Sequence, residues 1–383
     1  MDPARFTSKR AGRVALVGRG ELAFHAFDPA PIPRELRFTP GLVMTLSDAD
    51  RAIGRLTGLG ERLPNPHLLI RPSLRREAVA STRIEGTQST LGEVLSVEAQ
   101  QIPQTADVRE VLNYVRALEL GVDRLGELPL SNRLLREMHA ELMRGVRGQE
   151  RTPGDFRRSP NWIGGHGPSD AVFVPPTPDL MAAALGDFER YLHEEPSLPV
   201  LVRCALVHYQ FETIHPFLDG NGRLGRLLVV FYLVERGVVQ QPLLYLSAFF
   251  ERHRDEYVQR LQMVRERGEY EEWVEFFLRA VATQAAEAVR SAESLLLLRD
   301  EFRDRLRRAR VRGQAADAAD ALIGNPFVTV PGISEALGVT RQGAQHIVAS
   351  LERAGILRSE PTERRPALFV APEVLELLQR EAD

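Results

Sequence analysis

A glycine-rich loop between two apolar helical patterns constrains the fold of this 383-residue chain more than any other feature. Residues 199–213 and 223–235 both carry apolar side chains at helical spacing. Gly220 and Gly222 lie between these patterns, and glycine reaches left-handed backbone angles without a steric penalty. The segment therefore predicts two helices joined by a tight loop, with the second helix beginning where the glycines end.

The loop and the first turn of the second helix have the composition of an anion site. Successive N–H groups of Gly220, Asn221 and Gly222 can point at one position, and a helix start adds its own N–H groups and positive dipole end. Arg223 and Arg226 are three residues apart, so both guanidinium groups should lie near one face of the first turn. This arrangement predicts a phosphate-binding site.

Two further polar residues of the loop are suited to catalysis. His215 is a candidate general base near neutral pH, and Asp219 is a hard oxygen ligand of the kind that holds Mg2+ against phosphates. Either residue alone is more often structural. Next to the glycines and the paired arginines, they favour a functional phosphate site.

Residues 215–226 resemble the signature of Fic domains, His-x-Phe-x-(Asp/Glu)-Gly-Asn-Gly-Arg-x-x-Arg, at every specified position. The resemblance implies a mainly α fold, a Fic-type helical bundle with a small β-hairpin flap, and transfer of AMP from ATP to a protein hydroxyl. It also implies that His215 is the base, that Asp219 holds Mg2+ and that Phe217 anchors the loop in the core. The residues expected to bind the triphosphate are Gly220, Asn221, Gly222, Arg223, Leu224, Gly225 and Arg226.

A second motif precedes the signature. Gly86 is a natural helix stop, which places Glu85 in the last turn of a helix expected from residue 72 or 73, where the helix dipole disfavours a carboxylate. Ser81, Glu85 and Gly86 resemble the (Ser/Thr)-x-x-x-Glu-(Gly/Asn) motif of inhibitory helices in many Fic proteins. The resemblance implies that Glu85 pairs with Arg226, occupies the γ-phosphate position and prevents productive ATP binding.

Residues 154–178 interrupt the helical pattern. Two short extended runs around a glycine-rich turn predict a hairpin at 161–174. This hairpin is similar to the flap of Fic domains, which pairs with the backbone of the target protein and aligns its hydroxyl. Asp155 and Arg157 are candidate braces of this loop.

Tyr257 is the last candidate nucleotide-binding residue. Related proteins often carry an Arg-x-Glu-Tyr-Tyr string whose tyrosine contacts the nucleoside end, and Arg254-Asp255-Glu256-Tyr257 is similar to it. Val258 replaces the second tyrosine, so simple packing of Tyr257 is an equal alternative.

The remaining pattern is largely helical. Residues 1–45 are rich in proline and glycine and predict an extended arm lying over a later domain. Further helices are expected at residues 48–63, 105–125, 131–147, 178–192 and 270–306. The expected domains are an N-terminal arm with the inhibitory helix region, a Fic catalytic domain and a C-terminal domain, at residues 1–100, 101–310 and 315–383.

The C-terminal residues resemble a winged helix-turn-helix. Helices near 333–337 and 341–354 precede two runs that flank a wing, at 355–357 and 368–370. A DNA major groove would then face Arg341, Gln342, Gln345 and His346, and the wing tip would carry Arg364 and Arg365. The region has about as many acidic as basic residues, so binding of DNA, binding of protein and dimerisation all stay open.

Composition excludes several classes of chemistry. Lys9 is the only lysine, and its position rules out a Walker-type phosphate loop and lysine nucleophiles. Cys204 is the only cysteine, which rules out an internal disulfide framework and is typical of a reducing cytoplasm. Because the chain has no run of eighteen apolar residues and no apolar signal core, we expect a cytoplasmic protein without a membrane partner.

The leading hypothesis is a protein adenylyltransferase that uses ATP and Mg2+, acts on Ser, Thr or Tyr hydroxyls, and is restrained by Glu85. The alternatives are removal of AMP by the same site and a DNA-binding regulator whose Fic domain senses nucleotide. Transfer of UMP, phosphocholine or phosphate stays open, although the intact Gly222 argues against the phosphorylating variants. Self-modification is an expected first product, and a homodimer stays open.

Overall fold

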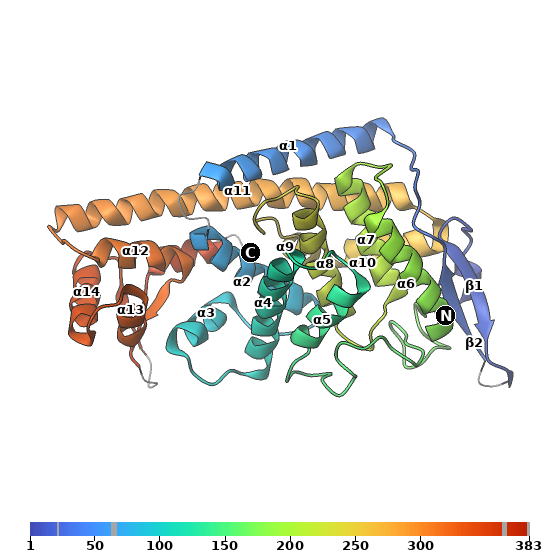
Figure 1. The fold of residues 1–383 in the computed structure, drawn as a ribbon, viewed down its shortest axis with the longest axis horizontal. Coiled ribbons are helices and arrows are strands. Elements are labelled where there is room, and N and C mark those ends of the chain that lie inside the picture. Colours follow the sequence, from blue (N-terminus) through green and yellow to red (C-terminus); the bar gives the residue numbers. More distant parts are fainter. Residues whose placement is uncertain (21–22, 63–66, 362–365, 381–383) are drawn as a thin grey trace. The chain divides into compact units, whose positions relative to one another are not determined.

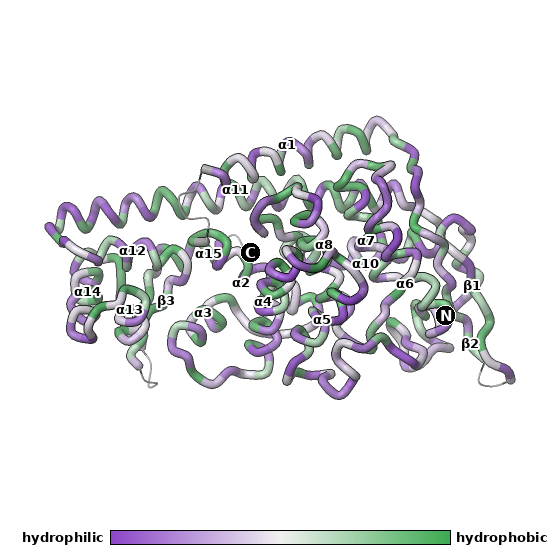
Figure 2. Tube along the Cα trace, viewed as in Figure 1, coloured by the Kyte–Doolittle hydropathy of each residue, from purple (hydrophilic) through white to green (hydrophobic). Residues whose placement is uncertain are grey.

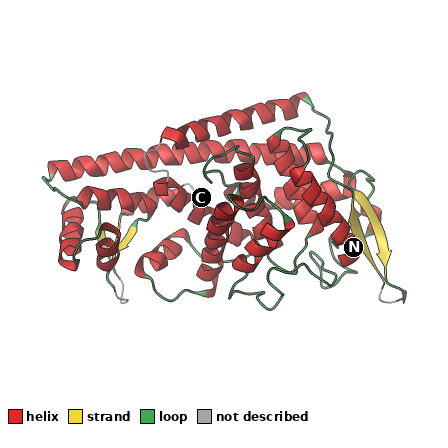
Figure 3. Ribbon diagram, viewed as in Figure 1, coloured by secondary structure: helices red, strands yellow, loops and turns green. Residues whose placement is uncertain are grey.

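The computed structural model describes residues 1–383 except 21–22, 63–66, 362–365 and 381–383. Helices dominate these residues, and their strands form two small antiparallel sheets (Figure 3). One sheet is a hairpin of β1 (Gly12–Val17) and β2 (Phe24–Pro29), and the other has the strand order β3-β5-β4. The expected mainly α fold is therefore confirmed.

Figure 1 labels the helices α1 to α14, which are numbered in the order of the chain. After a short 3-10 helix, η1 (Pro3–Arg5), and the hairpin, the next helices are α1 (Pro40–Arg62), α2 (His67–Ile84), α3 (Leu91–Gln100), α4 (Ala106–Leu125) and α5 (Asn132–Leu142). They are followed by α6 (Pro178–His193), α7 (Val200–Ile214), α8 (Asn221–Glu235), α9 (Ser247–Arg252), α10 (Arg254–Arg267) and α11 (Tyr270–Arg308). The C-terminal elements are α12 (Ala315–Gly324), β3 (Phe327–Thr329), α13 (Val330–Leu337), α14 (Arg341–Arg353), β4 (Arg358–Glu360), β5 (Leu368–Val370) and α15 (Pro372–Arg380).

Contacts between residues divide the chain into two compact units. The first unit is built from three segments, which are residues 1–52, 116–240 and 249–283. The second unit is built from three others, which are residues 53–115, 241–248 and 284–383. The division into three domains that the sequence indicated is a different partition and stays a prediction.

The N-terminal residues form a hairpin where an extended arm was expected. The strands pair from Gly12 with Pro29 to Val17 with Phe24. The hairpin contacts a later part of the first unit, because the N–H of Phe27 donates to the carbonyl of Val174 at 2.9 Å. The expected contact with a later segment is therefore present. The N-terminal backbone is a paired hairpin, however, and not a single extended arm.

The centre of the first unit is the antiparallel pair α7 and α8. Both were expected from their apolar patterns, and every residue from Leu201 to Ile214 is buried. A helix that is buried on all sides needs apolar residues all round, which is why neither helix shows a narrow apolar stripe. The indole Nε1 of Trp273 in α11 donates to the carbonyl of Ala205 at 2.8 Å and ties α11 to this pair.

Two helices begin earlier than their sequence pattern predicted. Thr39 caps α1 by accepting a hydrogen bond from the N–H of Leu42 at 3.2 Å, and Pro40 occupies the first helical position, where its missing N–H does no harm. In α2 the helix begins at His67 and contains Pro72 near its start. Pro72 lies inside the helix, beyond its first turn, so it did not mark the helix boundary as expected.

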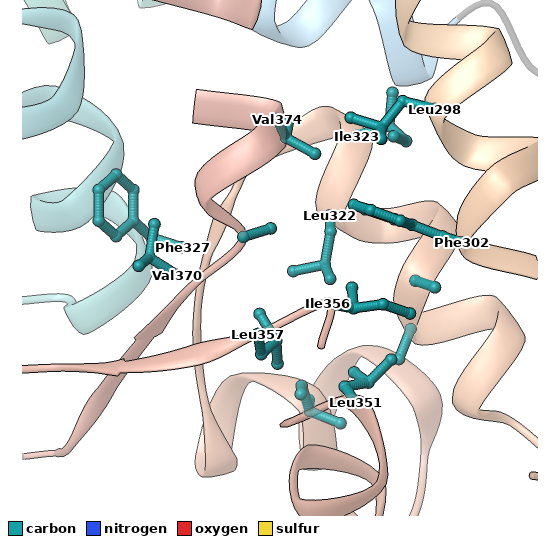
Figure 4. Close-up of a cluster of buried hydrophobic side chains, with 14 of the residues drawn as sticks. Leu298, Phe302, Leu322, Ile323, Phe327, Leu351, Ile356, Leu357, Val370 and Val374 are labelled. Atoms are coloured by element: carbon teal, nitrogen blue, oxygen red, sulfur yellow. The ribbon is translucent and has the colours of Figure 1, made fainter. Parts of the chain in front are cut away.

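The core of the second unit joins the C-terminal elements to α2 and α3. Leu69 of α2 and Leu95 of α3 belong to the same buried cluster as side chains from α11 to α15. The amide of Asn325 donates to the carbonyl of Leu95 at 3.2 Å, beside these contacts. Figure 4 labels ten members of the cluster, which are Leu298, Phe302, Leu322, Ile323, Phe327, Leu351, Ile356, Leu357, Val370 and Val374.

The order of the C-terminal elements is helix, strand, two helices and two strands, followed by α15. The first strand of the expected wing lies at β4, three residues later than expected, because Ile356 and Leu357 enter the core while the chain leaves α14. Arg364 and Arg365, expected at the wing tip, lie outside the described residues. The assignment as a winged helix stays a prediction.

Hydrophilic and hydrophobic residues are interspersed along the long helix α11, which was expected at nearly these bounds (Figure 2). Within the part of the chain that the structure describes, none of the helices combines the length and the hydropathy needed to cross a bilayer.

Candidate active site

The loop between α7 and α8 begins at a residue with strained backbone geometry. His215 ends α7 with φ of 49° and ψ of 61°, which is the left-handed region. For a residue with a side chain this conformation costs of the order of 1 kcal/mol, and such residues are concentrated at functional sites. At the other end of the loop Gly220 caps α8 with φ of 75°.

Gly220 has no room for a side chain. A Cβ atom there would lie 2.8 Å from Sδ of Met143 and 3.3 Å from Nε2 of His139. Both the positive φ and the crowding therefore require glycine.

Asn221 closes the loop with its side chain. Its Oδ1 accepts from the N–H of Phe217 at 2.9 Å, and its Nδ2 donates to the carbonyl of Phe217 at 2.8 Å. Asn221 is 2% exposed, and both polar atoms of its side chain form hydrogen bonds inside the loop. The part of Asn221 that can face an anion is therefore its backbone N–H at the start of α8.

The start of α8 presents backbone donors, as expected. An α-helix leaves the N–H groups of its first turn without acceptors inside the helix, and Gly220 and Asn221 stand at that position. The N–H of Leu224 already donates to the carbonyl of Gly220 at 3.0 Å. The donors aimed out of the helix are therefore those that precede Leu224, and contact of Leu224 and Gly225 with a nucleotide stays a prediction.

Close packing, and not an unusual backbone angle, accounts for the glycine at position 225. A Cβ atom at this position would lie 2.2 Å from the carboxylate Oε1 of Glu212, a residue of α7 that is itself buried. The carboxylate of Glu212 therefore occupies the space that a side chain at position 225 would need.

Two buried cations lie just inside the start of α8. Arg223 is 2% exposed and Arg226 is 3% exposed, although arginine is rarely buried. Nη2 of Arg223 lies 3.5 Å from Sδ of Met143 and 3.6 Å from Oδ1 of Asp219. Positive charge held away from water at a helix start attracts phosphate more strongly than the same charge in solvent.

Asp219 lies at the opening of this site, with its side chain about one third exposed. Its Oδ1 accepts from the N–H of Gly220 at 2.6 Å, which directs the carboxylate along the start of α8. One partly exposed carboxylate beside an anion site is suited to Mg2+, which takes most of its ligands from phosphates and water.

His139 of α5 contributes to the site and was missed by the sequence pattern. Its Nε2 lies 2.9 Å from the carbonyl of Asp219, and its Nδ1 accepts from the N–H of Gly154 at 2.8 Å. Because a carbonyl only accepts, Nε2 must carry the proton. Burial lowers the pKa of His139 to about 4, so the ring is neutral at physiological pH. In the sequence, His139 lies within an apolar helical pattern, and no local motif indicated that it would bind Asp219 and Gly154.

Tyr257, a predicted nucleoside contact, lies among aromatic side chains. It is 4% exposed, its ring stacks on Phe250 with centroids 4.5 Å apart, and its hydroxyl lies 2.8 Å from Nε2 of His208. Nδ1 of His208 lies 2.8 Å from the carbonyl of Gly225, so Nδ1 carries the proton and Tyr257 donates to Nε2. Burial lowers the pKa of His208 to about 3. Contact between Tyr257 and a nucleoside stays a prediction.

The expected hairpin at 161–174 is reduced to a single antiparallel bridge between Ile163 and Phe173. The N–H of Ile163 donates to the carbonyl of Phe173 at 2.8 Å, and the carbonyl of Ile163 accepts from Val172 at 3.0 Å. Gly164 and Gly165 both have positive φ, which turns the chain too tightly for longer strands. We call residues 161–174 the flap from here on.

The second motif lies at the end of α2, in the second unit. The helix ends at Ile84, Glu85 follows it and is exposed, and Gly86 has φ of 98°, which confirms the predicted helix stop. Ser81 is fully buried. The motif is therefore formed as a helix end, and the inhibitory role of its residues stays a prediction.

These features define a class of helical protein. In this class a short loop before a helix carries a histidine and a carboxylate, here His215 and Asp219, and the first turns of the helix carry two buried arginines. Residues 129–233 match the family model described as Fic/DOC family, and residues 43–123 match the model described as Fic/DOC family N-terminal. The chain therefore contains a Fic/DOC N-terminal region and a Fic/DOC domain at these residues.

Curated relatives match part of the chain. The proteins named protein adenylyltransferase Fic from Drosophila erecta and Drosophila grimshawi are 30% and 31% identical to it over 164 residues. The match covers 41% of this chain, and 31% and 32% of those proteins. The chain thus spans about a third of the length of these relatives.

Solved structures share the fold. A Fic family protein from Desulfovibrio desulfuricans G20 has a TM-score of 0.58 at 22% identity, and the match covers 89% of this chain and 98% of that one. Fic-1 from C. elegans has a TM-score of 0.51 at 21% identity, with 66% and 72% covered.

Proposed function

We propose that this protein is an adenylyltransferase that transfers AMP from ATP to a Ser, Thr or Tyr hydroxyl of a protein. The observation that carries the proposal is the position of His215, which caps the end of α7 one short loop before the start of α8, where backbone N–H groups and two buried arginines are suited to phosphate. The names of the curated relatives support the same reaction.

In the proposed reaction His215 accepts the proton of the target hydroxyl. The hydroxyl oxygen forms a bond to the α-phosphorus of ATP, and the bond from that phosphorus to the oxygen bridging to the β-phosphate breaks. Pyrophosphate leaves with the electron pair. The N–H groups at the start of α8, with Arg223 and Arg226, stabilise the negative charge that develops on the phosphates.

Asp219 would hold Mg2+, which neutralises phosphate charge when it is bound. The support for this role is the carboxylate itself, which is partly exposed and directed along the helix start by the N–H of Gly220. The flap would present the target by pairing with its backbone.

We propose further that Glu85, with Ser81 and Gly86, restrains the enzyme by occupying the γ-phosphate position opposite Arg226. The support is the helix end formed at Gly86 and the match of residues 43–123 to the N-terminal family model. Residues 1–100, 101–310 and 315–383 are the proposed division into restraining, catalytic and C-terminal parts, and a cytoplasmic location remains our expectation.

The test is labelling of the protein with ATP that carries a label on the α-phosphate. Replacing Glu85 by Gly should raise AMP incorporation at least tenfold, and adding His215→Ala should remove it. Mass spectrometry of the product identifies the modified residue and the transferred group, and parallel reactions with UTP and GTP test the base. Self-modification is the expected first product.

Glu195→Gly is the matched control, because Glu195 is an exposed carboxylate in a loop of the first unit. It should leave incorporation unchanged. Equal labelling by the Glu85→Gly and unaltered proteins at saturating ATP would refute the restraint. If AMP-modified protein loses AMP faster with Glu85 intact, the site works in the direction of removal.

A second candidate function is DNA binding through α14. Residues Arg341, Gln342, Gln345 and His346 are all exposed, whereas Ala344 and Ile347 on the opposite side are buried. Such a face is suited to a major groove. Fluorescence anisotropy with a randomised duplex at low salt should detect binding that weakens in an Arg341→Ala, Gln345→Ala double variant, and no binding at low salt would exclude this function.

A further inference from the structure

Arg157 lies at the base of the flap with its guanidinium group buried among backbone carbonyls. The residue is 2% exposed. Its Nε donates to the carbonyl of His215 at 2.8 Å, and its Nη2 donates to Ile214 at 3.2 Å and to Pro176 at 2.6 Å. Its Nη1 donates to Ser159 at 3.2 Å. All the hydrogen bonds recorded for this side chain in the described residues end on carbonyl oxygens.

A cation in this position is favourable because of where α7 ends. The last carbonyls of a helix have no intrahelical partner and carry the negative end of the helix dipole. Ile214 is the last residue of α7 and His215 is its cap. Burial lowers the pKa of Arg157 to about 10, so the side chain keeps its charge at neutral pH and satisfies both carbonyls.

The bonds of Arg157 fix three consecutive peptide groups. The side chain binds the carbonyls of Ile214 and His215, and the backbone N–H of Arg157 donates to the carbonyl of Pro216 at 2.9 Å. The two peptide planes that flank the Cα atom of His215 are therefore both held by one residue. Fixing these planes determines φ and ψ of His215, which lie in the left-handed region that a histidine rarely adopts.

The same guanidinium group also joins the two segments that lead into and out of the flap. Ser159 precedes the bridge between Ile163 and Phe173, and Pro176 follows it. One rigid, planar group thus binds a carbonyl from each of these two segments and two carbonyls from the end of α7. A shift of the segments that carry the flap would therefore require breaking bonds within this group of contacts.

We infer that Arg157 is a positioning residue that holds His215 in its left-handed conformation and sets the flap in register with it. The inference rests on the proposed function, because it assigns to Arg157 the alignment of a target hydroxyl with the base. Arg157 should therefore affect the rate of transfer and not the binding of ATP, since the hydrogen bonds of Arg157 are to the end of α7 and not to the start of α8.

The test compares Arg157→Lys with Arg158→Lys, both in the Glu85→Gly protein. Lysine keeps the charge, but its single ammonium cannot reach four carbonyls in a fixed plane. Arg158 is adjacent and exposed, so it is a matched control. Arg157→Lys should lower the rate of AMP incorporation at saturating ATP about 100-fold, the scale expected for misalignment by an ångström, with ATP affinity within about threefold of the parent. Arg158→Lys should change neither.

An imidazole NMR spectrum tests the geometry without activity. In protein with labelled histidine, the signal of His215 is the one that disappears in His215→Ala. It should shift in Arg157→Lys and stay in place in Arg158→Lys. An unshifted His215 signal together with an unchanged rate would overturn the inference. If the Glu85→Gly parent transfers no AMP, the proposed function fails, and this spectrum still decides whether Arg157 positions His215.

The parent protein supplies a measurement in case Arg157→Lys does not fold. In protein with 15N-labelled arginine, the Nε–H of Arg157 should exchange with solvent at least 100-fold more slowly than that of Arg158, because it is buried and bound to the carbonyl of His215. Equal exchange of the two groups would contradict the arrangement.

Discussion

The imidazole of His139 stacks on the ring of Phe217, with centroids 3.8 Å apart and planes inclined by 10°. This contact joins α5 to the loop that precedes α8. The same imidazole donates from Nε2 to the carbonyl of Asp219 in this loop and accepts at Nδ1 from the N–H of Gly154, so it ties the loop to the segment that precedes the flap.

Replacing His139 by Leu should therefore weaken both folding and Mg2+-ATP binding. The change leaves a carbonyl and an N–H group without partners, at about 1–3 kcal/mol each. His139→Gln keeps a donor for Asp219 and should lose less. Thermal unfolding and calorimetric titration with Mg2+-ATP measure the two effects, and equal affinities in all three proteins would show that His139 does not support Asp219.

Stability should fall as the pH drops from about 6.5 towards 4. The folded protein keeps His139 and His208 neutral, with pKa values of about 4 and about 3, whereas the unfolded chain protonates them near 6.5. The unfolded state therefore binds more protons in this pH range. Relative to neutral pH, protonation of each of these two histidines in the unfolded chain should lower the free energy of unfolding by about 3 kcal/mol at pH 4.5.

Urea unfolding at a series of pH values measures this slope. His208→Gln should be less stable at pH 7.5 but should depend less on pH. His193→Gln, which alters an exposed histidine, is the control. If His208→Gln and His193→Gln show the same slope as the parent, the buried imidazoles do not cause the acid loss.

Gly225→Ala should destabilise the first unit by about 1–3 kcal/mol, because the new methyl group would overlap Oε1 of Glu212 and force this buried carboxylate to shift. Shortening Glu212 to Ala should restore part of the loss in the double variant. Gly186→Ala in α6 is the control: a Cβ atom there meets nothing within 4 Å, and alanine should stabilise this helix by about 0.5 kcal/mol. Denaturant unfolding is measured for the parent, Gly225→Ala, Glu212→Ala, the double variant and Gly186→Ala, and additive effects of the two changes would exclude the clash.

Glu77 should determine how firmly α2 is held. It is buried, and its carboxylate accepts from the hydroxyl of Tyr114 at 2.8 Å and from the N–H and hydroxyl of Ser247. Tyr114→Phe should cost about 1 kcal/mol, and Glu77→Gln about 2 kcal/mol because its hydrogen bonds are charge-assisted.

Because α2 carries Glu85 at its end, loosening it should also raise AMP incorporation in protein that is otherwise unaltered. The order expected is Glu77→Gln above Tyr114→Phe above the parent, with Glu335→Gln, an exposed change, equal to the parent. Lower stability without any rise in incorporation would separate Glu77 from the restraint.

Local patterns predicted those parts of the structure that depend on local geometry. The loop before α8 and the helix stop at Gly86 were both expected, because positive φ angles and helix starts are properties of a few neighbouring residues. The extent of strand pairing in the flap was overestimated. Extended runs beside glycines indicate strands, but they cannot show that the two runs form only one bridge.

The sequence by itself determined which residues carry groups that are chemically suited to binding phosphate or accepting a proton, because those properties belong to side chains and to short stretches of backbone. Only the tertiary structure decided what holds them in place. His139, Arg157 and His208 contact residues 80, 58 and 17 positions away, respectively. Partners at such distances meet through the packing of whole helices, and burial then changes their pKa values, so no short motif can reveal them.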